Sequence, residues 1–81
     1  MNSRYRLIVL RRTYIKAEDR WLDAYRHLLL AERRVYDALT EDVFESRLAS
    51  LKAQEKELHR LRTLAMAARA DYYAAAEMPA R

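Results

Sequence analysis

The chain has 81 residues, of which 52% are hydrophobic and 35% charged, and its formal net charge is +4. This length predicts one small domain, and the composition is too apolar for a disordered chain. There is no glycine, no cysteine and a single proline, Pro79. Turn-rich sheet folds and phosphate loops need glycine, and disulfides and thiolate zinc sites need cysteine, so these classes are excluded.

Helical periodicity divides the chain into four segments. These are a first helix over about 3–39, a turn over about 39–42, a second helix over about 41–77 and a short tail over 78–81. Ser3 and Thr40 can cap the two helices through their hydroxyls, and Pro79 ends the second helix. Two arms of similar length around a short turn predict an all-α antiparallel two-helix hairpin, with residues 1–81 as one domain.

Apolar residues repeat every seven positions in both arms. In the first arm the repeat contains Leu7, Tyr14, Trp21, Leu28 and Val35, with Leu10, Ala17, Ala24, Ala31 and Ala38 three positions further on. In the second arm it contains Phe44, Leu51, Leu58, Ala65 and Tyr72, accompanied by Leu61, Ala68 and Ala75. A sustained seven-residue repeat predicts coiled-coil packing with a left-handed supercoil.

A turn centred near residue 41 fixes which residues of the two arms face each other. We expect Tyr14 opposite Ala68, Trp21 opposite Leu61 and Ala65, Tyr25 opposite Leu58, and Val35 opposite Leu48. The same register predicts two ion pairs in the seam, Glu18 with Arg62 and His27 with Glu55. Buried pairs of this kind would fix the register of the helices.

The first seventeen residues contain basic but no acidic side chains. The bases are Arg4, Arg6, Arg11, Arg12 and Lys16. This basic arm predicts a possible contact with nucleic acid, with an acidic protein surface or, through Ile8 and Val9, with an anionic membrane. The β-branched run over residues 4–10 could also form a strand, but no second strand is available to pair with it, so we predict a helix that frays before Leu7.

No catalytic or metal-binding constellation is evident. Neither His27 nor His59 has a second histidine three or four positions away, as a helical metal site would require. A two-helix hairpin also has no cleft that would enclose a substrate beside a carboxylate. We therefore predict a protein without catalytic residues, metal or cofactor, and not an enzyme.

The first arm carries more apolar surface than one helix–helix contact can bury. The surplus is formed by Leu22, Tyr25, Leu29, Leu30 and Tyr36. Exposed apolar patches mark contact sites, so these residues are predicted to bind protein. The occupant would be a second hairpin, giving a homodimeric four-helix bundle, or a groove of a different protein.

The predicted function is that of an adaptor or inhibitor acting on a larger bacterial protein. Arginine greatly outnumbers lysine and alanine is abundant, which favours a bacterial or phage gene. The apolar run over residues 7–10 is too short for a signal peptide or a membrane span, so a cytoplasmic location is expected. Nucleic-acid binding through the basic arm is the alternative.

A further alternative comes from residues 22–34, which contain the pair Tyr25-Arg26 within an amphipathic helix. This segment resembles the LYR-type adaptor signature, and the resemblance implies a small helical protein whose Tyr-Arg pair contacts an acyl carrier protein. Ala24 stands where that family has leucine, and the motif lies about twenty residues further into the chain than in the family.

Overall fold

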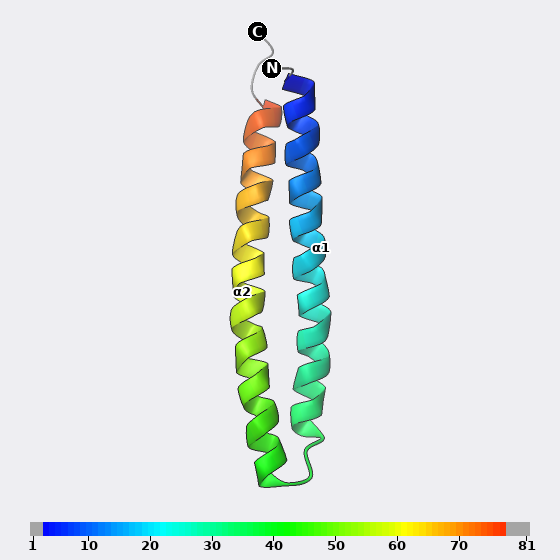
Figure 1. Cartoon of the computed structure of the whole chain (residues 1–81), viewed down its shortest axis with the longest axis vertical. Coiled ribbons are helices and arrows are strands. Elements are labelled where there is room, and N and C mark those ends of the chain that lie inside the picture. Colours follow the sequence, from blue (N-terminus) through cyan, green and yellow to red (C-terminus); the bar gives the residue numbers. More distant parts are fainter. Residues whose placement is uncertain (1–2, 78–81) are drawn as a thin grey trace.

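The computed structural model describes residues 3–77, which form two long antiparallel helices (Figure 1). Helix α1 spans Ser3–Tyr36 and helix α2 spans Glu41–Glu77. The helices lie side by side over their whole length, so that the molecule measures 64 × 16 × 13 Å. The predicted all-α helical hairpin is confirmed.

The start of α1 differs from the expectation of a frayed end. The helix is continuous from Ser3, and residues 4–10 are helical instead of extended. Leu7 and Leu10 are half-buried, so the first turns already pack on the seam and hold the helix together. The Ser3 side chain and Pro79 lie outside what the structure describes, so it does not test the predicted cap at Ser3 or the predicted stop at Pro79.

The connection between the helices occupies residues 37–40, so α1 ends three residues before the predicted position. The Ala38 N–H donates to the Val35 carbonyl at 3.2 Å, an i to i−3 bond that tightens the last turn. Thr40 must leave helical geometry to cap α2, and the chain has to cross between two packed helix axes, about 8–10 Å apart. These requirements end α1 at Tyr36.

Helix α2 begins where the sequence predicts, and Thr40 is its N-cap. The Val43 N–H donates to the Thr40 hydroxyl oxygen at 3.3 Å, and the Phe44 N–H donates to the Thr40 carbonyl at 2.9 Å. Glu41 and Asp42 place negative charge in the first turn, where the helix dipole favours it. No residue in the described part of the chain has a positive φ, so this reversal forms without glycine geometry.

The seam between the helices follows the seven-residue repeats, except that Phe44, the first member of the repeat predicted for the second arm, is 42% exposed. Along α1, every residue of the two predicted columns is buried or half-buried, from Leu7 to Ala38. On α2 the second column also includes Arg47 and Gln54, which fall on the same spacing as Leu61 but are polar. The Gln54 Oε1 atom is buried without a hydrogen-bond partner in the described structure, which is unfavourable.

The helix register agrees with the prediction near the middle of the hairpin and shifts towards its open end. The Arg62 guanidinium lies over the Trp21 ring, 5.9 Å from its centroid. Tyr14, however, packs edge-on against Tyr72 at 6.1 Å instead of facing Ala68. Side chains on a helix lean towards its N-terminus, which for α1 is the open end, so the long Tyr14 ring reaches one turn past Ala68.

The two predicted seam ion pairs do not form. Within residues 3–77 the ion pairs are Arg26–Asp23 and Arg60–Glu57, and each lies within one helix. Glu18 interacts with the Tyr14 hydroxyl, and Arg62 stacks on Trp21. These contacts keep the charged groups at the edge of the seam, where desolvation costs less than in its centre.

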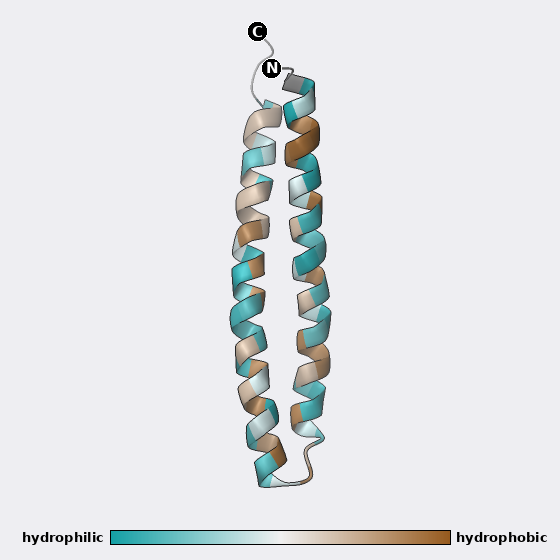
Figure 2. Cartoon of the chain, viewed as in Figure 1, coloured by the Kyte–Doolittle hydropathy of each residue, from teal (hydrophilic) through white to brown (hydrophobic). Residues whose placement is uncertain are grey.

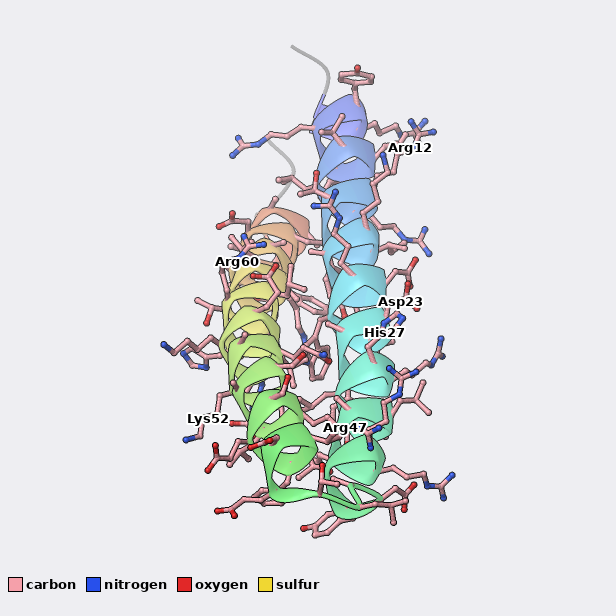
Figure 3. The ribbon with its side chains drawn as sticks, turned by 60° about the horizontal axis from the view of Figure 1, so that its bottom comes forward. Arg12, Asp23, His27, Arg47, Lys52 and Arg60 are labelled. Atoms are coloured by element: carbon pink, nitrogen blue, oxygen red, sulfur yellow. The ribbon has the colours of Figure 1, made fainter. Side chains whose placement is uncertain are left out.

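One polar contact between the helices was not predicted. The Arg47 guanidinium donates to the Arg34 carbonyl oxygen at 2.7 Å, close to the end of α1 (Figure 3). The last four carbonyls of a helix have no partner within the helix, and a cation there is also favoured by the helix dipole. Arg47 therefore caps α1 from the neighbouring helix.

The buried core of the described chain is small. Four residues are buried, namely Leu28, Val35, Leu51 and Ala65. The radius of gyration is 18.3 Å, whereas a compact chain of this length would have about 12 Å. The hairpin thus has one narrow interface, and most of its apolar side chains remain at the surface.

Candidate protein-binding face

Five apolar residues of α1 form a second column that does not face α2. The column consists of Ile8, Ile15, Leu22, Leu29 and Tyr36, spaced every seven residues. Each residue directly follows a seam residue, which places this outer column about 100° around the helix from the seam. All five side chains are exposed, from 38% for Leu22 to 87% for Tyr36. Figure 2 shows that apolar and polar segments alternate along α1.

The structure brings together most of the residues that the sequence singled out. Leu22, Leu29 and Tyr36 lie in the outer column, and Tyr25 lies between that column and the seam. Tyr25 is exposed, so it does not occupy the seam position opposite Leu58 that the register predicted. Leu30 is also exposed, but it lies about 100° further round the helix, away from the outer column.

The first two members of the outer column, Ile8 and Ile15, were not recognised as part of it. Their signal is the same seven-residue spacing continued towards the N-terminus from Leu22. Arginines surround Ile8, so charge is the dominant feature of this segment in the sequence. With them included, the column extends over four heptads, a length typical of coiled-coil contacts.

The corresponding column of α2 is different in character. It contains Glu45, Lys52, His59, Met66 and Tyr73, and only the last two are large apolar residues. The full column of exposed apolar residues therefore belongs to α1.

Charged residues of both signs border the outer column. On the side towards the seam are Arg11, Glu18 and Glu32, and on the other side are Arg12, Asp19, Arg26 and Arg33. Hydrogen bonding to Glu18 raises the pKa of the Tyr14 phenol, with desolvation as a second cause. An apolar strip bordered by charges is typical of a helix that pairs with another helix.

Aromatic residues gather near the open end of the hairpin, beside this face. Tyr14, Tyr72 and Tyr73 form a cluster with ring centroids 5.4–6.4 Å apart. The Arg69 guanidinium lies over the Tyr73 ring at 5.5 Å. These contacts join the two helices far from the turn and add cation–π attraction to apolar packing.

The basic arm is helical, and its charges do not form one stripe. Arg4, Arg6, Arg11, Arg12 and Lys16 are all exposed on the first turns of α1. At 100° per residue they are distributed around more than half of the helix circumference. Figure 3 shows Arg12 pointing outwards from α1. A groove of about 550 Å³ runs beside Lys16, with Ala17 and Ala68 in its floor.

The described residues contain no group of three potential metal ligands. The His27 Nδ1 atom lies 2.8 Å from the Asp23 carbonyl oxygen, a contact within α1. His27 borders an open groove with Ala24, Gln54 and Glu57. Glu57 pairs with Arg60, and this pairing lowers the pKa of the Glu57 carboxyl.

Comparison of the chain with protein-family models, with curated proteins and with solved structures found no match. Neither described helix contains a stretch apolar enough to cross a membrane.

Proposed function

We propose that this protein is a non-enzymatic helical interaction module that acts as an adaptor or inhibitor by binding another polypeptide along α1. The observation that carries the proposal is the regular outer column from Ile8 to Tyr36, which places one exposed apolar side chain at every seventh position. Single exposed apolar residues are common, but five of them in register along one side of a helix, bordered by charges, mark a candidate contact site. Its occupant is either a second hairpin, which would complete a four-helix bundle, or a helix or groove of a larger protein.

The arrangement also supports a mode of action. An elongated module with no enclosed site affects a partner by covering a surface or by linking two surfaces. Large aliphatic and aromatic side chains contribute most of the binding energy at such contacts, so Leu22, Leu29 and Tyr36 are the proposed anchors. An origin in a bacterium or phage and a cytoplasmic location remain part of this proposal.

The proposal is tested by placing charge in the outer column. The double variant Leu29→Glu, Tyr36→Glu should no longer bind its partner, whether that is a second hairpin or a different protein, because it places two charges in the apolar contact. Its helicity by circular dichroism should be retained, because both side chains are exposed in the hairpin. Leu30→Glu together with Leu64→Glu is the matched control, since these leucines are also exposed but lie off the column. Unfolding of the column variant, or equal loss of association in the control, would contradict the proposal.

Nucleic-acid binding through the basic arm is the second candidate. It is favoured by five exposed bases within the first four turns of α1 (about 3.6 residues per turn), a region without acidic residues. It predicts an affinity that falls steeply with salt and disappears when Arg4, Arg6, Arg11 and Arg12 become glutamine. Capture from a bacterial lysate with and without nuclease separates the candidates, because only nucleic-acid-mediated binding is lost after digestion.

A role as an acyl carrier protein adaptor depends on Tyr25 and Arg26. Both side chains are exposed, and Arg26 makes a 3.7 Å ion pair with Asp23. If this alternative holds, Arg26→Ala should abolish capture of an acyl carrier protein, and unchanged capture would refute it.

A further inference from the structure

We infer that the occupant of the outer column is a second copy of this chain, bound antiparallel about a two-fold axis that passes beside Leu22. This inference rests on the proposed function, because it specifies the partner of the same face. It is argued from the spacing of the column, the charges beside it and the surface area of the hairpin.

The column is self-complementary when it is reversed. Leu22 is its central member, with two apolar residues on each side at equal spacing. A two-fold axis at Leu22 therefore sets Leu22 against its own copy, Ile15 against Leu29 of the partner and Ile8 against Tyr36 of the partner. Each layer then contains two large apolar groups, and a two-fold dimer requires such a self-complementary patch.

The bordering charges favour this antiparallel register. It brings Arg11 next to Glu32 of the partner on one side of the column and Asp19 next to Arg26 of the partner on the other. Each pairing occurs twice because of the symmetry. The arrangement also brings Arg12 near Arg33 of the partner, so that four of the six charge pairs are attractive. Pairs in these flanking positions select the orientation and register of helices.

The competing arrangements are less favourable. A shift by one heptad in one direction sets Glu18 against its own copy and Asp19 against its own copy. A shift in the other direction sets Glu18 against Glu32 of the partner and Arg26 against its own copy, so that three repulsive pairs outnumber the two attractive pairs of Asp19 with Arg33 of the partner. A parallel pairing aligns the two basic arms, which contain no acid within residues 3–17. Like charges in facing positions are destabilising, so the register centred on Leu22 is preferred.

The surface area of the hairpin is consistent with a dimer. The chain exposes 7158 Å² for a mass of 9.7 kDa, whereas a compact protein of that mass exposes about 5,100 Å². A stable interface removes about 800 Å² from each partner. The hairpin thus has enough surface beyond that of a compact monomer to form such an interface along α1.

Charge exchange between Arg11 and Glu32 tests this arrangement. The two residues are 21 positions apart on one helix, about 31 Å, so they can interact only between chains. Arg11→Glu alone and Glu32→Arg alone should each weaken the dimer by about tenfold in sedimentation equilibrium. An equimolar mixture of the two variants should recover the wild-type affinity, because a heterodimer pairs opposite charges at both sites. Arg20→Glu, the same charge change on another side of α1, should have no effect.

The inference is overturned if the wild-type chain is monomeric at high concentration, or if mixing the two charge variants gives no gain. Leu22→Glu and its control Leu30→Glu distinguish failure of the proposed dimer from failure of the proposed function. If the wild type does not self-associate, but a different protein binds it in a manner that Leu22→Glu abolishes and Leu30→Glu does not, the inference fails while the proposed function stands. If Leu22→Glu changes neither self-association nor binding of another protein, both fail.

Discussion

The small core of the hairpin leads to a specific prediction for two leucines of α1, Leu28 and Leu30. Leu28 is 7% exposed and packs with Val35 and Leu51, whereas Leu30 is 57% exposed on a different side of the same helix. Replacement of each by alanine makes the same chemical change two positions apart. The difference in their effects therefore measures burial in the seam.

The exposed fractions of the two leucines set the expected loss of unfolding free energy in each variant. Leu→Ala removes the equivalent of three methylene groups, worth about 0.8 kcal/mol each when fully buried, so Leu28→Ala should cost about 2 kcal/mol. A residual cavity would raise this cost, but a seam open on both sides can close around the shortened side chain, which keeps the value at the lower end of the measured range, about 2–5 kcal/mol. Leu30→Ala should cost less than about 1 kcal/mol, because over half of its side chain is exposed and alanine favours the helix.

Urea unfolding followed by far-ultraviolet circular dichroism measures both effects at one protein concentration. The midpoint should fall clearly for Leu28→Ala and little for Leu30→Ala, without a change in slope. Equal midpoints for the two variants would refute the reasoning, because burial in the seam would then not determine their contributions to the free energy of unfolding.

Three further predictions concern the cap, a tyrosine and the proposed dimer. Thr40→Ala should lower the free energy of unfolding by about 1 kcal/mol because it removes the cap of α2, whereas Thr63→Ala within the helix should be neutral or slightly stabilising in the same urea assay. Glu18→Gln should lower the pKa of Tyr14 towards 10.0, as measured by NMR of the tyrosine ring carbons, since the carboxylate raises that pKa. Because its pKa is raised, Tyr14 stays protonated to a higher pH in the folded state than in the unfolded state. Its contribution to the free energy of unfolding is therefore fully present below pH 10.0 and is lost as the pH rises through the folded-state pKa. Arg33→Glu should lower the dissociation constant of the dimer in sedimentation equilibrium, because it turns the repulsion between residue 33 and Arg12 of the partner into an attraction. A higher dissociation constant would count against the register.

Much of the fold could be predicted from the sequence because the relevant signals are local. The seven-residue repeat requires only helical spacing, and Thr40 followed by two acids marks the start of α2 through its own hydrogen bond and charge. The end of α1 was harder to predict. Residues 37–39 have helical propensity, but the chain must reverse there, and this requirement depends on where the second helix packs.

The side-chain pairings across the seam could be predicted only in part. Spacing placed Trp21 near the right segment of α2, but the stack with Arg62 depends on how both side chains lean. The ion pairs expected for Glu18 and His27 were wrong because each group found a closer partner within its own helix. In the proposed binding face, Leu22, Leu29 and Tyr36 could be predicted from the sequence, whereas Ile8 and Ile15 lie in a segment whose dominant sequence feature is its arginines.

The tyrosine cluster has a consequence for how the hairpin opens. The turn joins the helices covalently at one end only, so separation of the helices should start at the opposite end. Near that end the helices are held together by the ring contacts of Tyr14, Tyr72 and Tyr73. These contacts must break before the helices can separate at the next layer, which contains Ala17 and Ala68. Loss of the tyrosine contacts should therefore allow opening at the termini to extend towards the middle of the hairpin.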